Sequence, residues 1–368
     1  MSENLLSGID HLGPAKVVEL YNPKSGLQAM VVIDNIAAGP AIGGIRMAPD
    51  VTANEVLRLA RAMTLKNAAA GLAHGGGKAI IQADHHQLTM EGKENLIRSF
   101  ALAIKDLQEY IPGPDMGTDE HCMAWIQDEI SRSVGLPREI GGIPLDEIGA
   151  TGIGLLAAAQ TAYDFLGLNL KGAKVAVQGF GAVGKHAARL LVEKGALIVA
   201  VADSQGTIYN DEGLEVSQLI DLKNARKSVI DYSGGKTGNL QEIISIPCDI
   251  WIPAARPDII DENNVNLLNT KLIIQGANIP VTEKAEEILF ARGIHIIPDF
   301  IANAGGVICA AVEFHGGTEQ NAIDTIIEKI SHNTREVLKK ATAENILPRM
   351  AANKIAELRL LKAMQFRR

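Results

Sequence analysis

Apolar and polar residues follow different spacings along the chain, and each spacing predicts a different element. Residues 16–21 and 27–33 are rich in apolar and β-branched side chains and are joined by Asn22-Pro23-Lys24-Ser25-Gly26. Because proline and glycine supply turn geometry, these runs predict a β-hairpin at the start of the fold. The first region should therefore contain antiparallel sheet.

A helix is predicted after the hairpin. Thr52 and Glu55 have the spacing of a capping box, and apolar residues recur on one face of residues 56–63. The helix should end near Gly71, which places Lys66 in its last turns. The unpaired carbonyls and the negative end of the helix dipole favour a cation there, so Lys66 should stay protonated and suit a carboxylate ligand.

The second half of the chain alternates short apolar runs with helical stretches, an order typical of a parallel, Rossmann-like sheet. Gly141-Gly142-Ile143-Pro144 precedes this half and is the best candidate for a hinge between domains. We therefore expect an α/β protein with a mixed-sheet domain in residues 1–145 and a Rossmann-like domain in residues 146–329. Residues 330–368 are helical in pattern and are expected to pack back on the first domain. The apolar runs are residues 174–178, 197–202, 249–252, 272–275 and 295–298.

Composition and charge exclude several classes of function. The chain has 368 residues, of which 47% are hydrophobic and 21% charged, a balance that allows two domains with sizeable cores. The formal net charge is -8 and no basic run exceeds Arg367-Arg368, so nucleic acid finds no continuous positive surface. Residues 1–12 lack an export signal, and no run reaches the roughly 20 apolar residues of a membrane span. We expect a protein that is neither exported nor embedded in a membrane.

Cysteine and histidine usage argues against disulfides and metal. Cys122, Cys248 and Cys309 are scattered, so they form neither a zinc pattern nor a disulfide framework, which fits a reduced, cytoplasmic location. His85-His86 and Asp119-Glu120-His121-Cys122 do not offer the spaced ligands of a closed zinc site. No metal site is expected.

A glycine-rich segment after the first apolar run of the second half has the signature of a dinucleotide site. Gly179-Phe180-Gly181-Ala182-Val183-Gly184 follows a strand and precedes a helical stretch, so that glycine permits a tight turn and the helix start faces phosphate. Asp203 ends the next strand, where a carboxylate can accept hydrogen bonds from ribose and would repel a 2′-phosphate. The predicted cofactor is NAD rather than NADP. Strand-to-helix packing for the glycines and a turn role for Asp203 are the simpler alternatives.

A second glycine-rich segment, Gly75-Gly76-Gly77-Lys78, presents one lysine at an expected strand start. Partial burial and nearby Lys66 would both lower the pKa of Lys78, and a lysine near neutrality can act as a base. Asp115 lies on the stiff loop Pro112-Gly113-Pro114-Asp115-Met116-Gly117, where it can carry protons to or from a leaving amine. A solvated lysine and a turn-forming aspartate are the ordinary alternatives.

Together these segments resemble the glutamate/leucine/phenylalanine/valine dehydrogenase family over nearly the whole chain. The resemblance implies NAD(P)-dependent oxidative deamination of an L-amino acid to its 2-oxo acid and ammonia, in a cleft between two domains. It also implies a homo-oligomer, commonly hexameric or octameric. Besides the fingerprint, it rests on Gly43-Gly44-Ile45-Arg46, Met63-Thr64-Leu65-Lys66, Gly75-Gly76-Gly77-Lys78, Pro114-Asp115-Met116-Gly117-Thr118 and Asn303-Ala304-Gly305-Gly306-Val307.

The resemblance also implies roles for individual residues. Lys66 would bind the substrate carboxylate, Lys78 would activate water and Asp115 would transfer protons. Other substrate contacts would come from Ile42, Gly43, Gly44, Gly113, Asn278, Val307 and Ala310. Cofactor contacts would come from Thr151, Gly179, Phe180, Gly181, Ala182, Val183, Gly184, Asp203, Ala254, Ala255, Asn278 and Asn303.

Two positions bear on the substrate side chain. Glutamate-specific members of the family place a lysine just before the Gly-Gly-x-Arg motif and a serine seven residues after the Asn of Asn-Ala-Gly-Gly, where this chain has Ile42 and Ala310. A distal carboxylate beside Ile42, Val307 and Ala310 would lose water without gaining a charge partner. We therefore expect an apolar amino acid. Small residues at Gly113 and Ala310 favour phenylalanine or tryptophan over leucine or valine.

Two alternatives stay open. The first is a glutamate dehydrogenase that binds the distal carboxylate from other positions. It is favoured by two segments that resemble glutamate-type members, Pro114-Asp115-Met116-Gly117-Thr118 and Val177-Gln178-Gly179-Phe180-Gly181. A catalytically silent NAD-binding regulator is the other. It would need the fingerprint but not Lys66, Lys78 and Asp115, all of which are present.

Overall fold

The computed structural model describes residues 9–367, and their contacts divide the chain into two compact units. Unit 1 runs to Leu145 and also contains Val307–Ala322 and the chain from Asn353 onward, whereas unit 2 contains Asp146–Gly306 and Ile323–Ala352. Residues 330–368 were expected to return together to the first domain, but those up to Ala352 belong to unit 2. A helical pattern shows which residues share a face and not what that face packs against, which explains the difference.

Unit 1 is built on a five-stranded mixed sheet with the order β1-β2-β4-β3-β5. The predicted hairpin is confirmed as the antiparallel pair β1 and β2, and β2 is also antiparallel to β4. Strand β3 lies between β4 and β5 and is parallel to both. The bounds are β1 (Lys16–Asn22), β2 (Leu27–Asn35), β3 (Ala41–Ala48), β4 (Gly75–Gln82) and β5 (Tyr110–Pro114).

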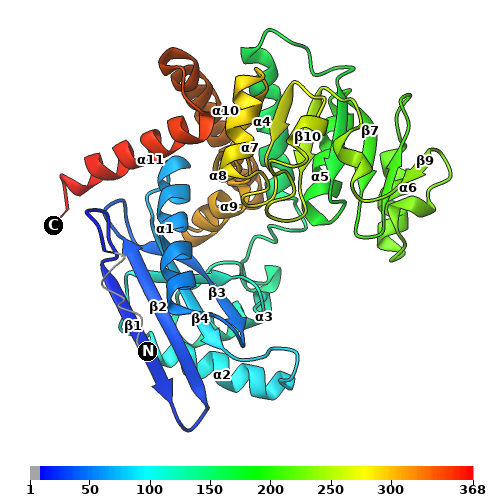
Figure 1. Cartoon of the computed structure of the whole chain (residues 1–368). Coiled ribbons are helices and arrows are strands. Elements are labelled where there is room, and N and C mark those ends of the chain that lie inside the picture. Colours follow the sequence, from blue (N-terminus) through cyan, green and yellow to red (C-terminus); the bar gives the residue numbers. More distant parts are fainter. Residues whose placement is uncertain (1–8, 368) are drawn as a thin grey trace. The chain divides into compact units, whose positions relative to one another are not determined.

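Helices cover both faces of this sheet (Figure 1). Val56 and Ala60 of α1 pack on Met30, Val32 and Ile80 on one face. The other face is covered by α2 and α3, whose apolar residues join the main core of the unit. The bounds are α1 (Ala53–Ala69), α2 (Met90–Ala103), α3 (Glu120–Ile130) and the short 3-10 helix η2 (Arg138–Ile140).

The start of α1 is confirmed in part. Thr52 is the N-cap and its side chain accepts a hydrogen bond from the Glu55 backbone. The Glu55 carboxylate pairs with Arg46 rather than with the cap backbone. The helix ends at Ala69, before the expected Gly71, and Lys66 lies in its last turn as predicted.

The position of Lys78 differs from the prediction, because β4 begins at Gly75 and Lys78 lies inside the strand. The glycine run is strand because β2 and β3 pair with it on both sides. A Cβ on Gly76 would lie 2.0 Å from the Thr64 backbone nitrogen, so glycine lets α1 pack directly on this strand. Since Ala79 and Ile81 face α2 and α3, alternation puts Lys78 on the face of α1.

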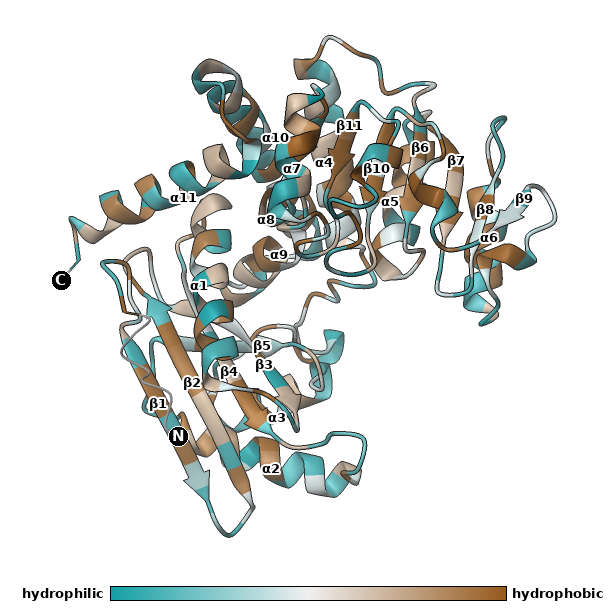
Figure 2. Cartoon of the chain, in the orientation of Figure 1, coloured by the Kyte–Doolittle hydropathy of each residue, from teal (hydrophilic) through white to brown (hydrophobic). Residues whose placement is uncertain are grey.

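Unit 2 is built on a seven-stranded sheet with the order β12-β11-β10-β6-β7-β8-β9. The five predicted strands are present and parallel, and Figure 2 shows how apolar β6, β7, β10 and β11 are. The antiparallel β8 and β9 were not predicted, because three-residue strands carry too little pattern. The bounds are β6 (Lys174–Gln178), β7 (Leu197–Ala202), β8 (Thr207–Tyr209), β9 (Lys236–Gly238), β10 (Ile250–Pro253), β11 (Leu272–Ile274) and β12 (His295–Ile297).

The helices of the second half include three whose residues are divided between the units, namely α9, α10 and α11. Within residues 9–367 no helix has the length and apolar character to cross a membrane. Residues 1–8, part of the segment that was expected to lack an export signal, and the terminal Arg368 lie outside the described residues. The bounds are α4 (Ala150–Phe165), α5 (Ala182–Glu193), α6 (Val216–Asn224), η3 (Val229–Asp231), η4 (Glu242–Ile244), η5 (Val265–Leu267), α7 (Glu283–Ala291), α8 (Asp299–Ala302), α9 (Gly305–Phe314), α10 (Glu319–Glu344) and α11 (Pro348–Met364).

Candidate functional site

Lys78 and Asp115 form a buried ion pair in unit 1. The Lys78 Nζ lies 2.5 Å from the Asp115 Oδ2, and Lys78 is only 6% exposed. The two residues come from β4 and from the loop after β5, with β3 between those strands. A Cβ on Gly44 of β3 would lie 3.3 Å from the Lys78 Nζ and 2.8 Å from the Asp115 Cβ. Glycine at this position therefore lets the two side chains meet across the intervening strand.

Arg46 extends the pair into a chain of alternating charges. Its Nε lies 3.2 Å from the Asp115 Oδ2 and its Nη1 lies 2.5 Å from the Glu55 Oε1. Arg46 was part of a recognised motif but was not predicted as a site residue. Its position two residues after Gly44 on β3, and so on the same face, was the available signal.

Burial and neighbouring charges set the protonation of the pair. Burial lowers the pKa of the Lys78 ammonium, and Asp115 opposes this shift without cancelling it. Burial alone would raise the pKa of Asp115, but Lys78 and Arg46 outweigh it and hold this pKa below its usual range. Arg46 is the cation that lowers the pKa of Lys78, a role the sequence analysis gave to Lys66. The result is a lysine that releases its proton more readily than a solvated one.

The expected loop around Asp115 is strand in its first half, because Pro112-Gly113-Pro114 belongs to β5, and Gly113 does not leave open space. The Asp115 backbone donates to the Thr118 Oγ1 at 3.0 Å, and the Thr118 hydroxyl donates to the Ile45 carbonyl at 2.8 Å. A Cβ on Gly113 would lie 3.2 Å from the Val134 Cγ2. The room for an aromatic ring that was expected beside Gly113 is therefore taken by Val134.

The other substrate-side predictions fall on β3, α1 and α9. Ile42 is buried on the face of β3 that carries Gly44 and Arg46. The Gly43 carbonyl accepts a hydrogen bond from the Tyr110 hydroxyl at 2.7 Å. Lys66 is half-buried in the last turn of α1.

On α9, Val307 and Ala310 precede a buried carboxylate, Glu313, that the sequence analysis missed. Glu313 accepts hydrogen bonds from the backbone of Gly135, at 2.7 Å, and of Ile143, at 2.8 Å. Burial raises the pKa of Glu313 although these donors oppose the shift. A single acid in an otherwise apolar helix was the available signal. This carboxylate fixes the helix to the loop that contains Gly141-Gly142.

The glycines of the fingerprint occupy three different environments in unit 2. Gly179 has a φ of +100°, which glycine adopts without strain. A Cβ on Gly184 would lie 1.9 Å from the Gly179 carbonyl oxygen, so this glycine allows close packing of α5 on the strand. A Cβ on Gly181 would meet nothing within 4 Å, which leaves its backbone approachable. These are the three roles that glycines have in a dinucleotide-binding turn.

The surroundings of the fingerprint fit a pyrophosphate. Helix α5 begins at Ala182 with no side-chain hydrogen bond at its cap, so its first N–H groups can face an anion, with Val183 in the first turn. Phe180 is 1% exposed, so its side chain is part of the core. Ala254 and Ala255 follow β10, and the Ala255 nitrogen lies 2.8 Å from the place of a Gly179 Cβ. The sheet order reverses here, between β6 and β10, which is where such sheets bind ligands.

Thr151, Asn278 and Asn303 come together in the same unit. The Asn303 Nδ2 donates to the Asn278 Oδ1 at 2.9 Å. A Cβ on Gly305 would lie 3.1 Å from the Thr151 nitrogen, so the motif that contains Asn303 packs on the start of α4. Among the described residues, the Asn303 Oδ1 and the Gln178 Oε1 are buried without a hydrogen-bond partner. Such orphaned acceptors are expected where a ligand supplies the donor.

Asp203 makes contacts that the ribose prediction did not anticipate. Its side chain is 6% exposed and its two oxygens accept hydrogen bonds from the Lys223 Nζ at 2.7 Å, the Ser228 Oγ at 2.9 Å and the Val229 nitrogen at 3.0 Å, as well as from the Gln205 nitrogen. Burial would raise its pKa, but these donors hold the pKa below its usual value. Four donors fill the acceptor sites of one carboxylate, which favours the alternative of a turn-forming role.

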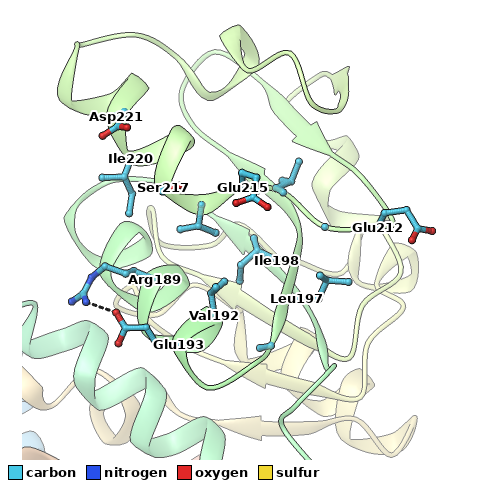
Figure 3. A pocket seen from close by; sticks show the side chains of 14 residues that line it. Arg189, Val192, Glu193, Leu197, Ile198, Glu212, Glu215, Ser217, Ile220 and Asp221 are labelled. Atoms are coloured by element: carbon cyan, nitrogen blue, oxygen red, sulfur yellow. Dashed lines mark hydrogen bonds and ion pairs between the residues drawn. The ribbon is translucent and has the colours of Figure 1, made fainter.

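A cavity of about 500 Å³ in unit 2 contains none of the predicted site residues (Figure 3). Its lining includes the apolar Val192, Leu197 and Ile220. Figure 3 also shows Arg189 paired with Glu193, with 2.6 Å between Nη1 and Oε1. The chemistry predicted from the sequence lies elsewhere in the chain.

Comparisons with known proteins match both halves of the chain to one family. A model described as Glu/Leu/Phe/Val dehydrogenase, dimerisation domain, matches residues 14–132, and one described as Glutamate/Leucine/Phenylalanine/Valine dehydrogenase matches residues 141–368. The chain is 39% identical to the glutamate dehydrogenase of Aeropyrum pernix over 90% of this chain and 85% of that protein. It is 36% identical to the NADP-specific glutamate dehydrogenase of Saccharolobus shibatae, over 90% of this chain and 83% of that protein.

Solved structures give the same result. The hetero-hexameric glutamate dehydrogenase of Thermus thermophilus, in its Leu bound form, has a TM-score of 0.84 and 28% identity, with 96% of this chain and 90% of that chain covered. The L-tryptophan dehydrogenase of Nostoc punctiforme has a TM-score of 0.78 and 25% identity, with 98% and 99% covered.

Replacing Asp115 by Asn should lower the pKa of Lys78 further, because the carboxylate that favours the ammonium form is removed. Acetylation of Lys78 by a small acylating reagent, followed by peptide mass spectrometry across pH, should then reach half its maximal rate at a lower pH than in the wild type. The exposed Lys24 serves as an internal reference. A midpoint that is unchanged or moves to higher pH would show that Asp115 does not control this lysine.

Proposed function

Because the chain belongs to the glutamate/leucine/phenylalanine/valine dehydrogenase family, we propose that it catalyses the reversible oxidative deamination of an L-amino acid to the 2-oxo acid and ammonia, with a nicotinamide dinucleotide as oxidant. The observation that carries this proposal is the buried pair of Lys78 and Asp115. A regulator that only bound the dinucleotide would not need a lysine with a lowered pKa beside a proton-transferring acid.

In the proposed mechanism the residues of unit 1 move protons. The bound nicotinamide supplies the acceptor for the hydride that leaves the substrate Cα. Lys78, as the free amine, accepts a proton from the water that attacks the resulting iminium carbon. The Asp115 carboxylate relays this proton from Lys78 to the amine nitrogen of the carbinolamine. The regenerated Lys78 amine then accepts the hydroxyl proton as the C–N bond breaks and the 2-oxo acid and ammonia form. Lys66, kept cationic at the end of α1, binds the substrate carboxylate.

Residues of unit 2 hold the cofactor in this proposal. The N–H groups at the start of α5, behind Gly181, bind the pyrophosphate. The Asn303 Oδ1, which has no partner, accepts a hydrogen bond from the nicotinamide amide or the substrate amine, and Asn278 lies beside it. This fit supports a dinucleotide without deciding between NAD and NADP.

Glutamate is the first candidate substrate. The relatives at 39% and 36% identity are glutamate dehydrogenases, which favours the alternative of the sequence analysis over the apolar amino acid it expected. The position of Val134 beside Gly113 also removes one argument for an aromatic substrate. In this proposal the distal carboxylate is bound by a cationic side chain at a position other than 42 or 310.

An apolar amino acid is the second candidate, and Ile42 and Ala310 favour it. Both are buried and neither carries a charge. A carboxylate that lost its water against them would be penalised by roughly several kcal/mol. The similarity to an L-tryptophan dehydrogenase structure shows that this fold also occurs in a protein named for an aromatic substrate.

For the remaining properties we propose NAD as the preferred cofactor and a cytoplasmic homo-oligomer, hexameric or octameric. The preference for NAD should be modest, because Lys223 neutralises the charge of Asp203 that was expected to repel a 2′-phosphate. Oligomerisation is assigned to unit 1, since the dimerisation-domain model matches residues 14–132.

Replacing Lys78 by Ala should reduce kcat by about 1000-fold, because a general base contributes roughly 10²–10⁴-fold to rate. NADH binding, measured by fluorescence titration, should be unchanged, since the pair lies in unit 1 and the fingerprint in unit 2. Lys24→Ala, in the exposed turn between β1 and β2, is the matched control and should keep full activity. Near-normal turnover by Lys78→Ala would refute the assignment of the base.

Initial rates of NADH production from glutamate, leucine, phenylalanine and tryptophan should decide between the two substrates. If glutamate is the substrate, its kcat/KM should exceed the others by roughly 100-fold, because a pocket built for a carboxylate leaves a buried cation unpaired with apolar ligands. A higher kcat/KM for tryptophan or phenylalanine would instead establish the apolar substrate that Ile42 and Ala310 favour.

Replacing Lys223 by Gln should raise the preference for NAD over NADP by about fivefold. The change leaves the charge of Asp203 without its counter-ion, and one ion pair at such a partly exposed site is worth on the order of 1 kcal/mol. The ratio of kcat/KM with the two cofactors measures it, with Lys194→Gln as a surface control. An unchanged ratio would show that Asp203 lies too far from the 2′ position to act.

A further inference from the structure

A buried polar network in unit 2 has no role in the proposed mechanism. Its centre is Arg349, near the start of α11, whose Nε donates to both oxygens of Glu286 at 3.0 Å. The Nη1 of Arg349 donates to the Asp299 Oδ1 at 2.9 Å, and its Nη2 donates to the Gln275 Oε1 at 2.7 Å. Gln275, Glu286 and Asp299 are each at most 5% exposed. The network therefore joins α11 to three buried side chains from separate parts of the unit.

The network holds both ends of the loop that carries Asn278. This loop follows β11 and runs from Gln275 to Ile279. Gln275 accepts a hydrogen bond from Arg349 at one end, and at the other the Ile279 nitrogen donates to the Asp299 Oδ2 at 2.8 Å. Ile279 has a φ of +47°, which β-branched residues rarely adopt. A conformation of this kind persists only when its surroundings impose it.

The same residues place the segment that carries Asn303. Asp299 begins α8, its nitrogen donates to the Gln275 Oε1 at 3.0 Å, and its carbonyl accepts from the Asn303 nitrogen at 2.7 Å. The Asn303 side chain then donates to Asn278 at 2.9 Å. One guanidinium therefore fixes both segments that bring these two amides together.

Arginine suits this position better than lysine would. A planar fork can satisfy two carboxylates and an amide oxygen at once, whereas an ammonium acts as a point charge. The Arg349 Cζ also lies 5.8 Å from the centroid of the Phe300 ring, whose contact restrains the guanidinium. Without Arg349, the buried Glu286 and Asp299 would lose the cation between them, and the two segments would lose their common support.

We propose that Arg349 is a positioning residue for the nicotinamide end of the cofactor site. It acts through Gln275 and Asp299 on the pair Asn278 and Asn303, and it touches no ligand itself. The unpartnered Asn303 Oδ1 is the acceptor that this arrangement presents to the cofactor. The inference rests on the proposed function, because it requires that the two amides face the dinucleotide.

The test compares NADH affinity among full-length variants that circular dichroism shows to be folded. Arg349→Gln should weaken binding by roughly tenfold, within the range expected when coupling passes through a network. Arg349→Lys should recover part of the loss, because it restores the charge but not the fork. The matched control is Arg335→Gln, an exposed arginine of α10 in the same unit, and it should bind as the wild type does.

A double-mutant cycle separates positioning from a purely structural role. In an Asn303→Ala background, Arg349→Gln should change the NADH dissociation constant by less than about twofold, because the amide through which it acts is already gone. A structural role would lower the melting temperature and leave the dissociation constant unchanged. If Arg349→Gln does not fold, Asp299→Asn takes its place, since Glu286 then keeps its partner.

The outcomes are distinct. NADH affinity within twofold of the wild type in Arg349→Gln, or in Asp299→Asn if that variant is needed, would overturn the inference and leave the proposed function intact. An equal loss of affinity with and without Asn303 would also overturn it. A wild-type protein that binds neither NADH nor NADPH would refute the proposed function itself.

Discussion

The proposed chemistry of this protein depends on one lysine ammonium that is buried beside a carboxylate. Burial makes the ammonium form of Lys78 costly, and Asp115 offsets part of that cost while Arg46 limits how far it can do so. The two groups can meet because residue 44 is glycine. A side chain at this position of β3 would lie between them. Gly44 and Gly76 thus serve close approach rather than flexibility.

Unit 2, by contrast, contains buried polar atoms that have no hydrogen-bond partner in the protein. The start of α5 has no side-chain cap and the Asn303 Oδ1 has no hydrogen-bond partner, while Asp203 and Asp299 accept hydrogen bonds on both carboxylate oxygens. Contacts of Arg349 with buried acids stabilise the loops that carry the orphaned groups. An unpaired buried acceptor is costly, so its retention at this point fits a site in which the ligand completes the hydrogen bonding.

The substrate question reflects two kinds of information that disagree. Identity over most of the chain favours glutamate, whereas the uncharged Ile42 and Ala310 favour an apolar side chain. Helix α9 carries Val307 and Ala310, and its Glu313 fixes it to the loop before α4. Specificity in such a site is a difference between two binding free energies, so a few lining residues can change it without altering the fold.

The sequence by itself determined the features that depend on neighbours along the chain. The hairpin, the start of α1 at Thr52, the five parallel strands and the glycine fingerprint follow from turn residues, caps and spacing that act within a few positions. Only the tertiary structure decided that Lys78 lies inside a strand, that Val134 fills the space beside Gly113 and that Asp203 is already occupied. These outcomes depend on atoms that come from distant parts of the chain, and no local pattern records which distant residue will supply them.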